Sequence, residues 1–144
     1  MFWIRAVVRL NDPSTYDALT AYFIRCRDDY KSSVFEKLKG LPGFNFSKLT
    51  DTVNTVWEKT KGGHDYSVVN ILPVAAEYGH RDTLEVGADL LKKSNDDYVL
   101  KRAREVFLSR TPATGDNAAL IAWYETNKNQ IVFDPQSKKF IVKP

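Results

Sequence analysis

Asp28-Asp29-Tyr30, His64-Asp65-Tyr66 and Asp96-Asp97-Tyr98 are near-copies of one tripeptide, and they recur at spacings of 36 and 32 residues. Each copy precedes a run whose apolar residues follow a helical period, and each run ends in a helix breaker. A second helical stretch then leads to the next copy or toward the end of the chain. Recurrence over about 20 to 50 residues is typical of repeat proteins. The sequence therefore predicts repeated helix–turn–helix units.

The aspartates of these tripeptides indicate where helices begin. A carboxylate just before a helix can accept hydrogen bonds from the unpaired N–H groups of its first turn. We therefore interpret the acid pairs Asp28-Asp29 and Asp96-Asp97 as helix N-caps. A general acid and base would instead have to face each other across a substrate. Asp12, followed by Pro13, and Asp116 are predicted to cap two further helices.

Helices are predicted wherever apolar residues recur every three or four positions between breakers. Their expected ranges are 2–10, 14–25, 30–39, 47–61, 66–78, 82–93, 97–109 and 117–127. The run 66–78 is the most apolar, so we expect it to be the most buried helix. Pro73 lies in its middle and predicts a kink, because proline removes one backbone hydrogen bond and crowds the preceding turn.

The end of the chain changes from a helical to a strand-like pattern. Ile131-Val-Phe133 and Phe140-Ile-Val142 are β-prone runs on either side of the turn-forming tetrapeptide Asp134-Pro-Gln-Ser137. Two such runs around a turn predict a β-hairpin. Because the last unit of a repeat protein has no neighbour on one side, we expect this hairpin to cap it.

Together these patterns predict an all-α fold, a right-handed α-solenoid of about four antiparallel helical pairs with a small C-terminal β-hairpin cap. A single repeat domain is expected over 1–144, with pairs at 2–26, 29–61, 65–93 and 97–128 and the hairpin at 131–142. The first helix carries Phe2, Trp3 and Ile4 near its start, which is much apolar surface for a terminal helix. We expect it to pack on a preceding repeat of a longer protein, or else on a second copy in a homodimer.

Two segments resemble bacterial HEAT-like repeats of the PBS-lyase type. Ala6-Val-Val-Arg-Leu-Asn-Asp-Pro13, followed by Tyr16-Asp-Ala-Leu19, is similar to the junction between two helices of such a repeat. Trp123-Tyr-x-x-Asn127, with the Val132–Val142 hairpin, resembles the closing segment of some members. The resemblance implies stacked helical pairs and the binding of other macromolecules. It implies no catalytic residue.

A weaker resemblance, to an ankyrin repeat, covers residues 72–91. It is carried by Leu72-Pro-Val-Ala-Ala-Glu-Tyr-Gly-His80, followed by Leu84 and Ala88-Asp-Leu-Leu91. The Thr-Pro-Leu-His opening of that family is absent, and the other turns lack Gly-His. Both families stack helical pairs, so the expected architecture is the same and the subtype stays open.

Composition and charge are those of a soluble globular chain. The 144 residues are 43% hydrophobic and 27% charged, and the net charge is only +3. The single cysteine, Cys26, cannot form an internal disulfide, which suits a reducing compartment. The first ten residues lack a signal-peptide pattern and the length to span a bilayer. We therefore expect a cytoplasmic protein with no membrane partner.

The residues that could perform catalysis or bind a metal do not form a recognisable set. His64 and His80 are sixteen positions apart, and a zinc site would need three or four converging ligands. We interpret both histidines as capping or solvent-exposed, and Cys26 as a small core residue of the second helix. Gly62-Gly63 lacks the Lys-Ser/Thr of a phosphate-binding loop. We expect no enzyme activity, no metal and no cofactor.

The candidate binding residues are a basic cluster and two tyrosines. The cluster comprises Lys92, Lys93, Lys101, Arg102 and Arg104, followed by Arg110. Its side chains would share a face if their two helices form a hairpin, but Asp96, Asp97 and Glu105 lie among them. We therefore favour a solvated face of mixed charge over a phosphate-binding one. Tyr16 and Tyr22 are predicted to reach the surface as contact residues.

Three functions follow from these observations. The first is a protein-binding scaffold or interaction module, which would use the concave groove of the repeats and could form the C-terminal part of a larger repeat protein. The second is a nucleic-acid-binding repeat protein that uses the face between Lys92 and Arg110. The third is an accessory domain of an enzyme, which would need a polar pocket with a perturbed acid or base.

Overall fold

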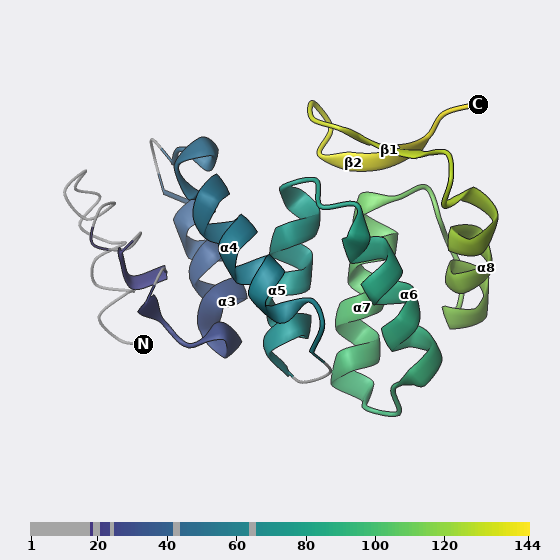
Figure 1. The fold of residues 1–144 in the computed structure, drawn as a ribbon, viewed down its shortest axis with the longest axis horizontal. Helices are drawn as coiled ribbons and strands as arrows, with labels where there is room; N and C mark the ends of the chain where they lie inside the picture. Colours follow the sequence, from purple (N-terminus) through teal and green to yellow (C-terminus); the bar gives the residue numbers. More distant parts are fainter. Residues whose placement is uncertain (1–17, 19–20, 24, 42–43, 64–65) are drawn as a thin grey trace.

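The computed structural model describes residues 18, 21–23, 25–41, 44–63 and 66–144 (Figure 1). This part of the chain is mostly helical and ends in a small sheet. Its elements are α3 (Asp28–Lys39), the 3₁₀-helix η1 (Phe46–Leu49), α4 (Thr50–Thr60), α5 (Tyr66–Glu77), α6 (Asp82–Lys93), α7 (Asp97–Arg110), α8 (Asn117–Asn127), β1 (Ile131–Asp134) and β2 (Lys139–Val142). The predicted helix at 2–10, most of the one at 14–25, and the residues Asp12, Tyr16 and His64 lie outside the described residues.

Helices that alternate in the sequence lie side by side in space. α5 packs between α3 and α7, and α6 packs against α8. Each of α4, α5 and α6 also contacts the helix that follows it. The indole Nε1 of Trp57 in α4 donates a hydrogen bond to Asp82 at the start of α6, at 2.8 Å. The helices therefore form one continuous packed unit.

The core lies along α5, which is in contact with α3, α4, α6 and α7. Nine of its twelve residues are buried, which confirms the prediction that this run is the most buried helix. Pro73 lies inside the helix as expected and is half-buried. Trp57 and Phe107 are fully buried and extend the same core into α4 and α7.

The predicted N-caps are only partly confirmed. Asp96 caps α7 by accepting hydrogen bonds from the backbone N–H groups of Tyr98 and Val99, and Asp116 caps α8 through Ala119. The prediction for α3 is wrong. Asp28 is the first residue of that helix, and Arg27 occupies the N-cap position without a side-chain cap. The helix therefore begins two residues before the predicted start at Tyr30.

The C-terminal hairpin forms as predicted, with Ile131 opposite Val142 and Phe133 opposite Phe140 in an antiparallel pair. It contacts α7, the first helix of the last predicted pair. It lies across the C-terminal ends of α5 and α7 (Figure 1). The Phe133 ring packs so closely on Gly79 that a Cβ atom there would lie 2.6 Å from it.

Two contacts of Lys138 fasten the hairpin to the helices. Its carbonyl oxygen accepts a hydrogen bond from Nη1 of Arg110 at 3.3 Å. Its Nζ lies 3.7 Å from the centre of the Phe46 ring, which itself stacks on Tyr78. Burial raises the pKa of the Tyr78 hydroxyl above its usual range. The hairpin thus joins η1, the turn after α5 and the end of α7.

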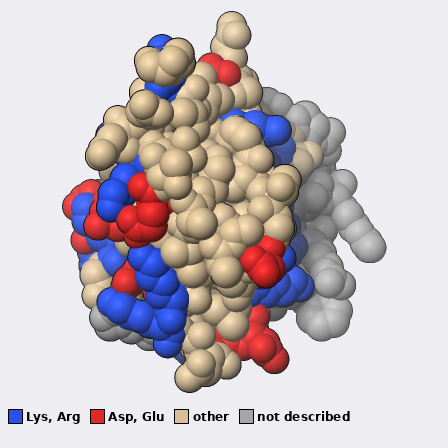
Figure 2. Space-filling view, turned by 90° about the vertical axis from the view of Figure 1, so that its right-hand side faces the viewer, with Lys and Arg blue, Asp and Glu red and all other residues tan. Residues whose placement is uncertain are grey.

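Since the hairpin covers helix ends, the outer face of α8 remains open. Ala118, Ala119 and Ala122 are exposed there. Figure 2 views the molecule from this end and shows a broad uncharged surface with charged side chains around it. The sequence predicted a closed C-terminal end, and in the structure this end presents small apolar side chains to solvent.

Candidate binding site

The basic cluster predicted from residues 92–110 does not form one positive face. Lys92 pairs with Glu125 of α8 at 2.6 Å, and Lys93 pairs with Asp89 of its own helix at 2.8 Å. Hydrogen bonds from Lys128 and Lys92 lower the pKa of Glu125 to about 2, so this carboxylate is charged at neutral pH. The positive charge of both lysines is therefore offset by neighbouring acids.

The basic residues in the middle of α7, Lys101, Arg102 and Arg104, have different surroundings. Arg102 donates to Ser32 of α3 at 2.6 Å and pairs with Glu105, while its Nε is buried without a hydrogen-bond partner in the described structure. Arg104 donates instead to Asn117 at the start of α8. Lys101 is exposed and forms no ion pair with a described residue. This geometry agrees with the expected face of mixed charge.

Only one of the two predicted contact tyrosines, Tyr22, is among the described residues. Tyr22 is half-buried and packs against the core, and Tyr16 lies outside the described residues. The tyrosines with the most exposed rings are those of the repeated tripeptide. Tyr30, Tyr66 and Tyr98 have exposed fractions of 40%, 52% and 44%. They stand at the N-terminal ends of α3, α5 and α7.

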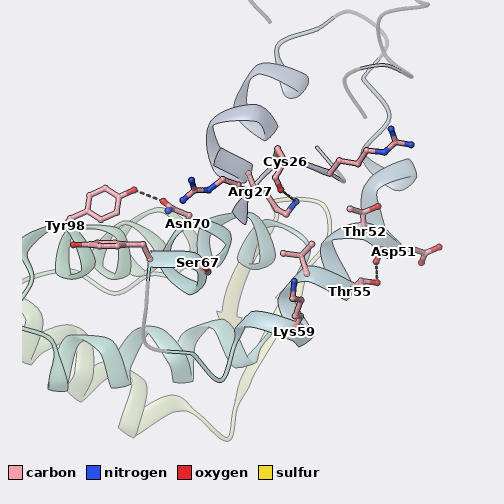
Figure 3. Close-up of a pocket in the computed structure, with 13 residues that line it drawn as sticks. Cys26, Arg27, Asp51, Thr52, Thr55, Lys59, Ser67, Asn70 and Tyr98 are labelled. Carbon is pink, nitrogen blue, oxygen red and sulfur yellow. Dashed lines mark hydrogen bonds between the residues drawn. The ribbon is translucent and has the colours of Figure 1, made fainter. Parts of the chain in front are cut away.

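A hollow of about 1050 Å³ opens beside these helix ends. We call it the tyrosine hollow, because Tyr66 and Tyr98 form part of its wall. Its other described walls are residues 25–27, the exposed side of α4, and the first turns of α3 and α5 (Figure 3). Several successive helices therefore contribute side chains to one open cavity.

The described walls of the tyrosine hollow carry more positive than negative charge. Arg25, Arg27, Lys31 and Lys59 line it, together with the single carboxylate of Asp51. Arg25 and Lys59 are exposed, and neither forms an ion pair with a described residue. Arg25 precedes α3 in the sequence, whereas Lys59 lies near the end of α4 (Figure 3). Their charges are thus available to an anionic group in the hollow.

Lys31 is a buried cation, with 2% of its surface exposed. Its Nζ donates hydrogen bonds to the carbonyl oxygens of Phe23 at 2.7 Å and Cys26 at 3.0 Å. A cation at such carbonyl groups is favourable because they carry the negative end of the backbone dipoles. Lys31 therefore fixes the chain segment that forms one wall, and its charge adds to the field there.

The two wall tyrosines connect α5 to α7. The Tyr66 hydroxyl donates to the carboxylate of Asp96 at 2.7 Å, and the Tyr98 hydroxyl donates to Oδ1 of Asn70 at 2.6 Å. The hydrogen bond from Tyr66, assisted by backbone N–H groups, lowers the pKa of Asp96. The tyrosine of one tripeptide thus contacts the capping acid of the next. Sequence reasoning missed this role, which depends on α5 and α7 being neighbours.

Asn70 is the least expected residue of the hollow. It lies in the apolar helix α5 with 6% of its surface exposed, and it lines the cavity. Its Oδ1 accepts the hydrogen bond from Tyr98, and its Nδ2 donates to no described residue. Buried amide groups are normally hydrogen-bonded. A single asparagine inside the run Val68-Val-Asn-Ile-Leu72 was the sequence signal that could have identified it.

Cys26 and His80 differ from their predicted surroundings. Cys26 is half-buried at the wall of the hollow, where its Sγ donates to the carbonyl of Phe23 at 3.4 Å. His80 is neither a side-chain cap nor exposed. Its Nε2 lies 2.7 Å from Oδ1 of Asn54, and burial lowers its pKa. The ring packs beside Trp57, so its role is within the helix packing.

Two general features of the described residues bear on the kind of site. No group of three or more His, Cys, Asp or Glu side chains in this part of the chain is arranged to hold a metal ion. None of its helices is long and apolar enough to cross a membrane.

The sequence matches no protein-family model, and comparisons with curated proteins and with solved structures find no significant similarity.

Proposed function

We propose that this chain is a helical-repeat interaction module of the HEAT-like solenoid type, and that it binds a segment of another protein in the tyrosine hollow. The neighbour relations of the helices support the repeat interpretation. α3, α5 and α7 lie next to one another in a row. Each of them is followed in the sequence by a helix that packs against this row. Stacked helical pairs have this arrangement, and their open face is a common binding surface.

The hollow itself is the observation on which the proposed binding function rests. It combines about 1050 Å³ of open space with exposed aromatic rings, hydroxyl groups and the exposed cations Arg25 and Lys59, which form no ion pair with a described residue. Concave sites with a few convergent polar groups are typical of ligand recognition. Tyrosine rings add contact area with little loss of conformational freedom. Such a surface suits an extended peptide better than a flat protein face.

The chemistry of the walls favours binding over catalysis. Asp51 is the only carboxylate among the described wall residues, and its helix neighbour Thr55 donates a hydrogen bond to its backbone carbonyl. A general acid and base would need two titratable groups within reach of one substrate. The Cys26 thiol donates a hydrogen bond to the carbonyl oxygen of Phe23. We therefore propose a binding module without an enzyme activity of its own.

To test this proposal, a bulky side chain is placed in the hollow and the binding of peptides is measured. Peptides selected from a phage-displayed random library on the wild-type chain would be labelled, and their affinity measured by fluorescence anisotropy. Thr55→Trp places a large ring at the wall, and we expect it to weaken binding about tenfold or more, a change of about 1.4 kcal/mol.

Thr126→Trp is the matched control for Thr55→Trp. Both threonines are exposed on helices, and both donate to the carbonyl four residues earlier, at 2.8 and 2.9 Å. Thr126 lies on α8, which contributes no residue to the described walls of the hollow. The control should bind like the wild type. Equal affinity of both variants for every selected peptide would contradict the proposal.

A further inference from the structure

We infer that the ligand of the tyrosine hollow is an acidic peptide segment, with an oxygen of the peptide accepting a hydrogen bond from Nδ2 of Asn70 and its carboxylates facing Arg25 and Lys59. This inference rests on the proposed binding function and adds the chemical class of the ligand. Three features of the described walls support it. They are the excess of positive charge, the unused donor of Asn70 and the geometry of the tyrosine pair.

Charge complementarity is the first argument. Four of the described wall residues are cationic and one is acidic. Arg25 and Lys59 are exposed and have no acidic partner in the described structure, whereas Lys92 and Lys93 elsewhere each have one. Complementary charge raises association rates and selects among partners. An acidic segment would gain these contacts without breaking an existing ion pair at either residue.

Asn70 supplies the second argument. Tyr98 fixes the orientation of its amide by donating to Oδ1, so the nitrogen is the atom left to interact with a ligand. The residue has 6% of its surface exposed and lines the hollow, and its Nδ2 is not among the described buried side-chain atoms that lack a hydrogen-bond partner, so this donor is accessible from the hollow. A carboxylate or peptide carbonyl oxygen is a slender acceptor that can reach it. Figure 3 shows Asn70 and Tyr98 on the side of the hollow toward which Arg27 extends.

The tyrosine pair favours a peptide over single-stranded nucleic acid. The ring centres of Tyr66 and Tyr98 are 5.8 Å apart, and the ring planes make an angle of 59°. Successive bases stack on rings that offer separate, accessible faces along the strand. These rings instead face each other at a tilt, and both hydroxyls are already bound to protein acceptors. They form an apolar corner that suits side chains of a peptide.

The small number of exposed cations also favours a peptide over a nucleic acid. Proteins that bind a nucleic-acid backbone through electrostatic contacts can make about six to ten contacts to phosphates. Lys31 is buried against carbonyl oxygens, so only the exposed cations can contact a ligand directly. A short acidic peptide needs few such contacts, because main-chain hydrogen bonds and side-chain packing add to its affinity.

The first arm of the test compares defined probes on the full chain. The probes are a fluorescein-labelled dodecapeptide with alternating glutamates, its Glu-to-Gln counterpart, and an oligothymidylate of similar length. We expect the acidic peptide to bind about tenfold more tightly than either of the others. Lys59→Glu should weaken its binding about tenfold. Lys101→Glu makes the same change at an exposed, unpaired lysine outside the hollow and should have no effect.

The second arm removes the donor of Asn70 while keeping its acceptor. Asn70→Asp can still accept the Tyr98 hydroxyl, but it loses both N–H groups. We expect it to weaken the acidic peptide about tenfold or more. Asn117→Asp adds the same charge and keeps the acceptor for Arg104, so it should bind normally. Tyr98→Phe leaves Nδ2 intact and should retain binding, which separates loss of the donor from loss of the tyrosine bond.

The outcomes separate this inference from the proposed function. An acidic peptide that does not bind, or whose binding Lys59→Glu leaves unchanged, would overturn the inference. Tighter binding of the oligonucleotide, lost in Lys59→Glu, would overturn it in favour of a nucleic-acid site. If Thr55→Trp still weakens the binding of library peptides that carry no excess of acidic residues, the proposed binding function is retained and the inference of an acidic ligand is wrong. If Thr55→Trp has no effect on them, the binding function itself is wrong.

Discussion

Replacing Glu77 by glutamine tests whether a buried ion cluster holds the row of α3, α5 and α7 together. The Glu77 side chain is 8% exposed, and its Oε2 lies 2.9 Å from Nζ of Lys39 and 3.1 Å from Nη2 of Arg110. Lys39 belongs to α3 and Arg110 to α7, so one carboxylate of α5 joins three helices. Glutamine has nearly the same volume but no charge, and it leaves both cations without this partner.

The expected loss of stability follows from the distances and from the exposure of the cations. At an effective dielectric constant of about 20, each contact supplies about 5 to 6 kcal/mol of attraction before desolvation is subtracted. Breaking a fully buried pair costs about 3 to 5 kcal/mol, because a charge is left buried. Lys39 and Arg110 keep exposed fractions of 25% and 22%, so water can partly solvate them. We therefore expect a cost of about 2 to 3 kcal/mol.

Urea unfolding followed by circular dichroism would measure this change in the free energy of unfolding. Glu36→Gln is the control, because Glu36 pairs with the same lysine at 3.0 Å but is 63% exposed. Exposed pairs contribute about 0.2 to 1 kcal/mol. Burial tends to lower the pKa of Lys39, but hydrogen bonds to Glu77 and Glu36 outweigh it and raise the pKa. The pKa of Lys39 should therefore fall in the Glu77→Gln variant, which lacks the charged partner. Equal losses of stability in the two variants would refute the reasoning.

Three further changes test other parts of the structure. Burial lowers the pKa of His80 below 6.5, so the unfolded chain binds the proton more readily than the folded chain. The free energy of unfolding should therefore fall as the pH drops below that value. The urea midpoint of His80→Gln should change less than that of the wild type between about pH 7.5 and 5.5. Asp96→Ala removes both the cap of α7 and the acceptor of Tyr66, and should lower Tm by roughly 3 to 6 °C in a thermal scan, more than Tyr66→Phe does. In Gly79→Ala the new Cβ atom would be strained by the backbone φ of +84° and would contact the Phe133 ring of the hairpin. Chemical unfolding should show that the free energy of unfolding falls by about 2 to 3 kcal/mol. Gly62→Ala adds a Cβ atom in open space and should lower it by less than about 0.5 kcal/mol.

Helix limits were predictable where they depend on local chemistry. α6 and α8 span 82–93 and 117–127, as the apolar periods and breakers indicate. The cap at Asp116 involves groups within three residues of each other. α3 begins at Asp28, two residues before the predicted start at Tyr30, because Tyr30 donates its backbone N–H to the carbonyl of Arg27. This bond does not depend on the aspartates that the tripeptide shares. A repeated motif therefore need not produce the same helix start each time.

The basic cluster could have been judged more accurately from helical geometry alone. Successive residues of an α-helix are separated by about 100° around its axis. Arg102 and Arg104 are therefore about 200° apart and must point in nearly opposite directions, as their contacts with Ser32 and Asn117 confirm. The condition that all these side chains share one face is therefore not met by Arg102 and Arg104. The actual candidate site draws on residues between 25 and 98, which no short window of sequence brings together.

The position of the hairpin could not be predicted, because it depends on a contact between distant residues. Phe133 packs where Gly79 leaves space, and Lys138 reaches the Phe46 ring. Each of these residues is unremarkable in its own segment. Only the packed helices place the turn after α5 and the end of α7 close enough for one small sheet to cover both.

The repeated tripeptide has a different meaning in three dimensions from the one that its sequence indicates. In the copy at 96–98 the aspartate caps a helix, and the tyrosine of the preceding copy joins one unit to the next through the bond from Tyr66 to Asp96. The same rings form a wall of the tyrosine hollow. A residue that stabilises the stacking of helices therefore also shapes the candidate binding site. Because stacking and binding share Tyr66 and Tyr98, the site can exist only when α5 and α7 are packed side by side, and a ligand that contacts both rings would in turn stabilise that packing.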